Sequence, residues 1–124
     1  MIRLIQRRLI IPRGDTGSFS IPLRESVEEN DTAVFYIYDS MTKESVHAIK
    51  GNIEGDIINI FFKREDTAKL SPKKYLWDIV IYKNPQYEED DEEQIRPING
   101  EEINSYYAAF SLPICEIKEV AQNV

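Results

Sequence analysis

The chain has 124 residues, of which 42% are hydrophobic and 30% are charged, and its net charge is −7. This length and composition predict a single folded soluble domain spanning residues 1–124. A single cysteine, Cys115, excludes an internal disulfide and a multi-cysteine zinc site, and a single histidine, His47, leaves few residues for metal or nucleophile chemistry. The acidic balance argues against a nucleic-acid partner.

The N-terminal segment carries no targeting signal. Arginines interrupt its apolar residues, so it lacks the apolar core of a signal peptide. The longest apolar run, residues 33–38, is far shorter than the roughly 20 residues that span a bilayer. We therefore expect no membrane partner, and a protein made in the cytoplasm or assembled from there into something larger.

Alternation of apolar and polar residues dominates the chain and predicts about seven strands. The expected strands, in chain order, are residues 4–11, 18–23, 33–39, 46–53, 57–63, 74–82 and 110–120. Pro22 predicts an edge strand, and Gly51 predicts a bulge inside its strand. Residues 65–70 predict one helical turn capped by Asp66. Short strands with turns between them are typical of an antiparallel β-sandwich or barrel.

The strand over residues 74–82 places its large side chains on one face. These are Tyr75, Trp77, Ile79 and Ile81. Asp78 lies on the opposite face, where burial would require hydrogen-bond donors. A general base is the alternative role for Asp78, but no second carboxylate or histidine stands at a recognisable spacing.

Candidates for other chemistry are few. His47 and Cys115 could pair only through the fold, and no catalytic signature surrounds Cys115. The acidic run at residues 88–93, inside a long connection over residues 84–104, lacks the ligand spacing and the glycine of a calcium loop, so a solvated loop is the simpler interpretation. We therefore expect no catalytic, metal-binding or cofactor-binding residues, and no enzyme activity.

Charge is unevenly distributed along the sequence. The first 24 residues contain a single acid, Asp15, and five arginines: Arg3, Arg7, Arg8, Arg13 and Arg24. A basic edge on an acidic chain suits docking between copies or docking on an acidic partner, although an ordinary solvated strand would have the same composition. The residues expected at such a partner interface are Arg3, Arg7 and Arg8, together with Tyr106 and Tyr107 beside the long connection.

Two segments together resemble a known family. An Arg-Gly-Asp-Thr-Gly turn at residues 13–17 precedes the strand at 18–23, and Glu-Asp-Thr-Ala-Lys-Leu at 65–70 precedes Ser-Pro-Lys-Lys-Tyr-Leu-Trp-Asp-Ile at 71–79. This arrangement resembles the N-terminal domain of the upper baseplate proteins of tailed bacteriophages of Gram-positive hosts. In that family an Arg-Gly-Asp turn follows the first strand, and an Asp-Thr-x-x-Leu turn leads into a Tyr-x-Tyr/Trp-Asp-Ile strand.

The resemblance implies an immunoglobulin-like β-sandwich that serves as a non-catalytic attachment domain in a phage or prophage particle. It implies other tail or baseplate proteins as partners, a homo-oligomer that forms or joins a ring, and a virion component assembled in the bacterial cytoplasm. Members often continue into a helical linker and a distal domain. This sequence stops at Val124, and if the chain is complete there, it is a freestanding module.

An alternative function is a carbohydrate-binding β-sandwich that recognises host cell-wall glycan. Exposed aromatic rings beside a loop stack on sugar rings, and Tyr87, Tyr106 and Tyr107 flank the long connection. The same three tyrosines could instead pack the loop against the domain.

Overall fold

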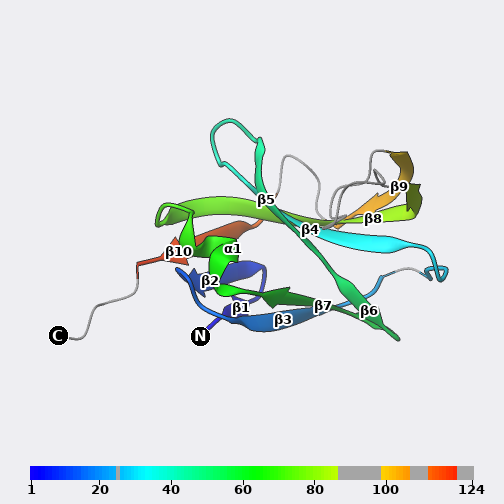
Figure 1. Cartoon of the computed structure of the whole chain (residues 1–124), viewed down its shortest axis with the longest axis horizontal. Helices are drawn as coiled ribbons and strands as arrows, with labels where there is room; N and C mark the ends of the chain where they lie inside the picture. The colour runs from blue at the N-terminus through cyan, green and yellow to red at the C-terminus, as the bar shows by residue number, and fades with distance from the viewer. Residues whose placement is uncertain (25, 87–98, 107–111, 120–124) are drawn as a thin grey trace.

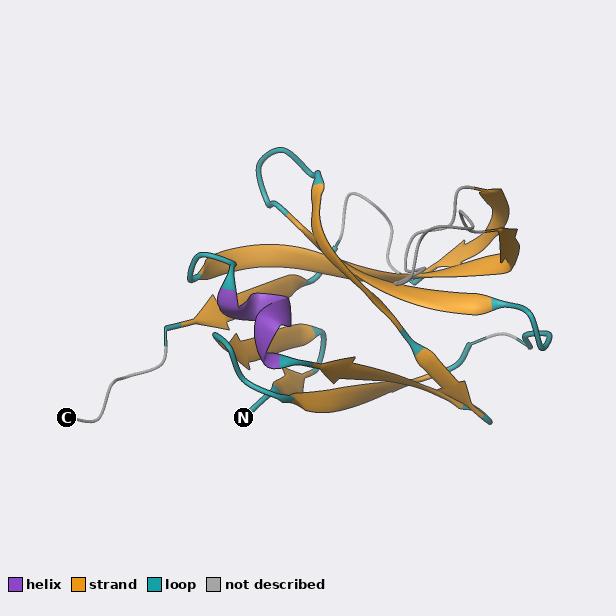
Figure 2. Ribbon diagram, in the orientation of Figure 1, coloured by secondary structure: helices purple, strands orange, loops and turns teal. Residues whose placement is uncertain are grey.

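The computed structural model describes residues 1–24, 26–86, 99–106 and 112–119, and for residues 99–105 it describes the backbone alone. Two β-sheets pack face to face around an apolar core, with one short helix at one end (Figures 1 and 2). Strands account for 59% of the chain. The predicted all-β sandwich with a single helical turn is therefore confirmed.

The larger sheet has seven strands. In order across the sheet they are β1 (Arg3–Ile5), β2 (Arg8–Pro12), β10 (Ile114–Lys118), β8 (Lys73–Gln86), β4 (Thr32–Tyr38) and β5 (Ser45–Lys50), and β9 (Asn99–Ser105) also pairs with β8. The pairing of β2 with β10 is parallel, whereas the other pairs are antiparallel. Strands from the two ends of the chain thus lie side by side.

The smaller sheet has three strands, in the order β3 (Gly17–Pro22), β7 (Ile57–Phe62) and β6 (Asn52–Glu54). Among the described strands β3 pairs only with β7, so the edge position predicted from Pro22 is confirmed. β6 and β7 form a hairpin, whose turn contains Gly55 at a φ of 58°.

The described residues form ten strands instead of about seven, because two predicted strands are each divided. The predicted strand at residues 4–11 is a hairpin, because Gln6, at a φ of 58°, turns the chain between β1 and β2. The predicted strand at residues 46–53 changes sheets at Gly51, where the chain crosses from β5 to β6 instead of forming the expected bulge. A Cβ atom at Gly51 would lie 3.0 Å from Cδ1 of Ile60, so the crossing brings the backbone close to β7. In addition, β8 continues to Gln86 and β9 lies within the predicted loop.

The helical turn is α1 (Arg64–Ala68), and Asp66 is its third residue instead of its N-cap. The Asp66 carboxylate accepts the backbone N–H of Lys63, the actual N-cap, at 2.6 Å. Its other oxygen lies 2.8 Å from Nε2 of His47 on β5. Asp66 therefore caps the helix as predicted, but from the third helical position instead of the N-cap. Its contact with His47 also links α1 to the larger sheet.

Aromatic side chains from both sheets form the centre of the core. Trp77 is fully buried, and its ring centroid lies 5.7 Å from that of Phe19 and 5.8 Å from that of Phe35. Phe62 completes the cluster through contacts with both phenylalanines. Tyr75, Trp77, Ile79 and Ile81 all belong to the core, so the face predicted for this strand is confirmed.

The opposite face of β8 is buried around Asp78, which is 3% exposed. One Asp78 oxygen accepts the backbone N–H of Ile79 at 2.8 Å, which supplies a donor of the kind that burial requires. The neighbouring side chains of this second apolar cluster are Val34, Tyr36, Ala48 and Val80. Asp78 thus belongs to a packed layer on the outer side of the larger sheet.

The turn after β2 is joined to α1 across the end of the sandwich. The backbone N–H of Gly14 donates to Oγ1 of Thr67 at 2.9 Å, and Nε of Arg13 donates to the carbonyl of Ala68 at 3.0 Å. Thr67 is fully buried, and Gly14 has a φ of 76°, which favours glycine. The two segments that carry the family resemblance therefore bind each other.

Replacing Thr67 with valine keeps the side-chain volume but removes the acceptor for the Gly14 N–H. We expect this change to lower the free energy of unfolding by about 1–3 kcal/mol, because a partly buried donor loses its partner. Urea denaturation measures the difference. Thr16→Val, at an exposed position of the same turn, is the control, and equal effects of the two changes would contradict the proposed link.

Candidate docking surface

His47 and Cys115 do not form a nucleophile–base pair. His47 instead contacts Asp66, and Cys115 is a fully buried core residue. Burial raises the pKa of the Cys115 thiol to about 12, so the thiol is protonated at neutral pH. The structural role expected for this cysteine fits its position.

The described residues contain neither a metal-binding cluster nor a membrane-spanning helix. Within these ranges no three His, Cys, Asp or Glu side chains lie close enough together to hold a metal ion. None of the described helices is long and apolar enough to cross a membrane. The acidic run at residues 88–93 lies outside the described part of the chain.

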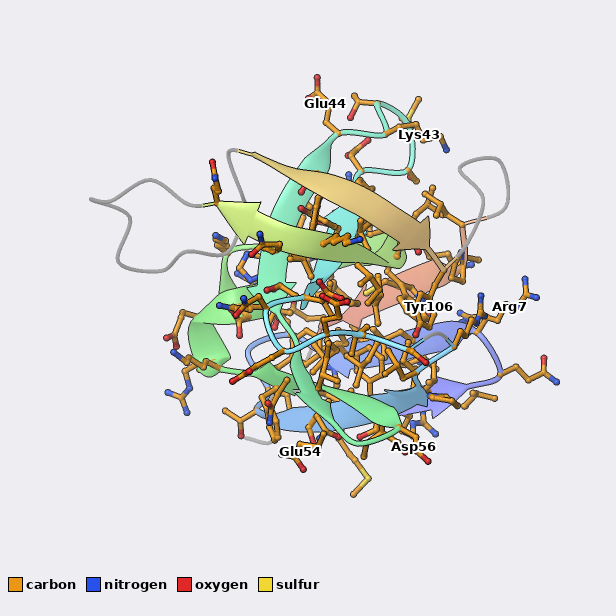
Figure 3. The ribbon with its side chains drawn as sticks, turned by 90° about the vertical axis from the view of Figure 1, so that its right-hand side faces the viewer. Arg7, Lys43, Glu44, Glu54, Asp56 and Tyr106 are labelled. Carbon is orange, nitrogen blue, oxygen red and sulfur yellow. The ribbon has the colours of Figure 1, made fainter. Side chains whose placement is uncertain are left out.

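Several of the N-terminal arginines make contacts within the chain. Arg8 forms an ion pair with Glu116 on β10, and Arg13 lies 3.5 Å from Glu119. Arg24 donates to the carbonyl of Tyr106 at 2.7 Å and lies over its ring. Arg3 has an exposed side chain on β1, and the side chain of Arg7 projects outward from the β1–β2 turn (Figure 3). The predicted basic edge thus has only part of its charge directed outward.

The tyrosines expected at an interface do not form an exposed aromatic surface in the described residues. Tyr106 is 6% exposed, and its hydroxyl donates to the carbonyl of Pro22 at 3.2 Å. Its predicted role as an exposed contact is therefore wrong, because its ring packs in the core between the two sheets. Tyr87 and Tyr107 lie outside the described residues.

Arg3 and Arg8 belong to a larger surface on the outer side of the larger sheet. Leu9 and Ile11 of β2, Cys115 and Ile117 of β10, and Tyr75 of β8 point into the core, so the alternate residues of these strands point outward. We call this surface the basic face, and it consists of Arg3, Ile5, Arg8, Lys74, Leu76, Ile114, Glu116 and Lys118.

Strand register places the apolar residues of the basic face in one row across its strands. Ile5 lies opposite Arg8, and Ile114 lies opposite Leu76, which in turn lies opposite Tyr38. Ile5 is 51% exposed, a high value for a large aliphatic side chain on a strand. Apolar residues surrounded by arginine and lysine are typical of a protein–protein interface.

Glu116 is the only acidic residue of the basic face. The ion pair with Arg8, assisted by the charges of Lys118 and Lys74, holds the pKa of Glu116 below its usual value. Three cationic side chains, those of Arg8, Lys118 and Lys74, therefore act on one carboxylate, on a chain whose net charge is −7. The sign of the charge on this face is opposite to that of the molecule as a whole.

The loop between β4 and β5 follows directly after Tyr38 and holds Met41 in solvent. Asp39 organises it, because one carboxylate oxygen accepts the N–H groups of Met41 and Thr42 at 2.9 and 3.0 Å. The other oxygen binds Nζ of Lys73 at 2.9 Å, and the Thr42 and Lys73 contacts hold the pKa of Asp39 far below its usual value. Met41 is 89% exposed. These hydrogen bonds hold the loop that exposes Met41 in a defined conformation.

Six residues of the basic face were missed from the sequence, as was Met41 on the loop after Tyr38. The six are Ile5, Lys74, Leu76, Ile114, Glu116 and Lys118. The lysines lie in β8 and β10, far along the chain from β1, and only the sheet order brings them together. The alternation of β8 did place Lys74 and Leu76 on the face opposite Trp77, which was the available signal.

Ionised Glu116 stabilises the folded chain, because its folded-state pKa is lower than the usual 4.5. This stabilisation is present above pH 4.5 and is lost as the pH falls through the lower folded-state value. We expect Glu116→Gln to reduce stability at pH 7, and the difference from wild type to shrink on acidification below pH 4.5. Urea denaturation over this pH range, with Glu44→Gln as the control, measures it. A difference independent of pH would contradict the assignment.

Comparison with known proteins gave no relative from which a function could be transferred. No protein-family model matches the sequence, and neither a curated protein nor a solved structure is significantly similar to it. The case for a function therefore depends on the geometry described above and on the two sequence segments that meet at Gly14 and Thr67.

Proposed function

We propose that the chain is a non-catalytic attachment module of a phage or prophage tail, similar to the N-terminal domain of upper baseplate proteins. The observation that carries this proposal is the contact between the two segments of the resemblance. Gly14 and Thr67 are 53 positions apart, yet they are joined by a hydrogen bond of 2.9 Å. Short motifs that match by chance have no reason to form one structural unit, so their contact supports a shared architecture.

The docking surface supports a role in attachment. The basic face is part of a hydrogen-bonded sheet backed by the aromatic core, so its side chains are held on a rigid support. Rigid presentation of apolar and arginine side chains lowers the entropic cost of binding. The basic charge would direct this face toward an acidic partner in a tail or baseplate.

Peptide mass spectrometry of purified particles, produced by a host that encodes the chain, tests the proposed function. We expect the chain in intact particles, at a fixed ratio to a known tail protein that suits a threefold or sixfold ring. Its absence from particles would overturn the proposal. Retention of the free chain on host cell-wall glycan would then favour the carbohydrate-binding alternative.

Charge reversal on the basic face tests the surface assigned to attachment. We expect Arg3→Glu together with Lys74→Glu to reduce incorporation into particles by about tenfold or more, because like charges would then face the acidic partner. Arg8 is left unchanged, since its ion pair with Glu116 belongs to the fold. Quantitative mass spectrometry of particles made with each variant measures the effect.

The control for this experiment is Lys69→Glu together with Lys83→Glu. These exposed lysines lie outside the basic face, and the double change alters the net charge by the same amount. Circular dichroism establishes that both double variants are folded. Equal incorporation of the two variants would remove the basic face from the proposal.

A further inference from the structure

We propose that the basic face binds the acidic end of a second copy of this chain, so that copies join head to tail. The acidic end consists of the loop at residues 26–31 and the turn between β6 and β7. Its carboxylates are those of Glu28, Glu29, Asp31, Glu54 and Asp56. This inference rests on the proposed attachment function and names the partner of its docking surface.

The acidic end is a groove of about 550 Å³. Glu28, Glu29 and Asp31 line it from the loop, Val27 and Ile53 contribute apolar surface, and Lys50 is the one cation among its described lining residues. A second groove of about 440 Å³ shares Val27 with it and is also lined by Arg24 and Asp56. A groove that combines carboxylates with apolar side chains suits an arginine or lysine, whose stem is apolar and whose head is charged.

Hydrogen bonds hold the acidic end in place. The Asp31 carboxylate accepts the backbone N–H of Glu28 at 2.8 Å and that of Asn84 at 3.2 Å. The N–H of Leu23 donates to the carbonyl of Asp56 at 2.7 Å, which joins the chain entering the loop to the β6–β7 turn. The groove is thus formed before a partner arrives, which favours binding.

The basic face carries the complementary side chains. On β1, Arg3 and Ile5 lie on the same side of the strand and are both exposed. An Arg3 guanidinium can form charge-assisted hydrogen bonds with the groove carboxylates while Ile5 contacts Val27 and Ile53. Lys74 and Lys118 extend the positive charge beyond β1.

The two surfaces lie on different parts of the molecule and cannot contact each other within one chain. β6 and the turn after it lie at one end of the long axis, whereas β2 and β10 lie toward the other (Figure 1). From the side, Arg7 projects to the right, and Glu54 and Asp56 lie at the bottom (Figure 3). An interface between two different surfaces of identical copies is heterologous, and it closes into a ring when the rotation between copies allows it.

Sedimentation velocity of the full chain over a range of concentrations tests self-association. We expect wild-type association that weakens at high salt, because salt screens the charges of an exposed interface. We also expect the dissociation constant to rise about tenfold or more when either surface is reversed. The basic-face variant is Arg3→Glu with Lys74→Glu, and the acidic-end variant is Glu54→Lys with Asp56→Lys.

Mixing the two variants gives the most direct test of the proposed interface. Neither variant alone is expected to associate, because each keeps only one of the two complementary surfaces. An equimolar mixture pairs the unchanged acidic end of the basic-face variant with the unchanged basic face of the acidic-end variant, so a complex of the two variants should form. The Lys69→Glu with Lys83→Glu variant is the charge-matched control and should associate like wild type. Thermal unfolding of each variant separates misfolding from loss of the interface.

Three results would overturn the inference. The first is a wild-type chain that stays monomeric over the whole concentration range, which would assign the basic face to a different acidic protein. The second is association that survives both reversals, and the third is a mixture that stays monomeric. Each of them leaves the proposed attachment function intact if the chain is found in particles, whereas absence from particles would overturn that function even if the chain self-associates.

Discussion

The hydrogen bond from the Trp77 indole to the Arg7 carbonyl, 3.0 Å long, joins the centre of the core to the hairpin that carries the docking residues. Trp77 is fully buried between phenylalanines of both sheets, so its N–H needs an acceptor inside the fold. The Arg7 carbonyl meets this need, which fixes the β1–β2 turn against the core. Removal of a core aromatic side chain of this kind typically costs about 3–5 kcal/mol, and here it would also release the turn.

The position of that turn explains how an acidic chain acquires a basic surface. β2 pairs with β10, and β10 pairs with β8, so cations from the N-terminal segment, the middle of the chain and the last strand lie on one face. Glu116 at the centre of this face neutralises Arg8 and leaves the other cations to act outward. The acidic end is on other elements, β6 and the loop before β4, and the separation of charge follows from the sheet order.

Sequence patterns within single strands were sufficient to predict which side chains of those strands face the core and which strand lies at an edge. The alternation of β8 predicted the core positions of Tyr75 and Trp77, and Pro22 predicted an edge strand. Contacts between distant segments decided the rest. The crossing at Gly51 resembles a bulge in sequence because both continue a strand pattern, and Tyr106 became a core residue through Pro22 and Arg24, which lie more than 80 positions earlier. The positions of Lys74 and Lys118 on the same face as Arg3 could not be predicted either, because they depend on the order of the strands in the sheet.

The most direct test of the central claim, that the outer face of β1, β2, β10 and β8 is the docking surface, is covalent footprinting of the chain free and in its assembled particle. Lysine acylation and methionine oxidation report on Lys74, Lys118 and Met41, and Lys69 and Lys83 serve as internal references. We predict protection of the first three residues on assembly and unchanged labelling of the two references. Equal labelling of Lys74 and Lys118 in the free and assembled chain would contradict the account.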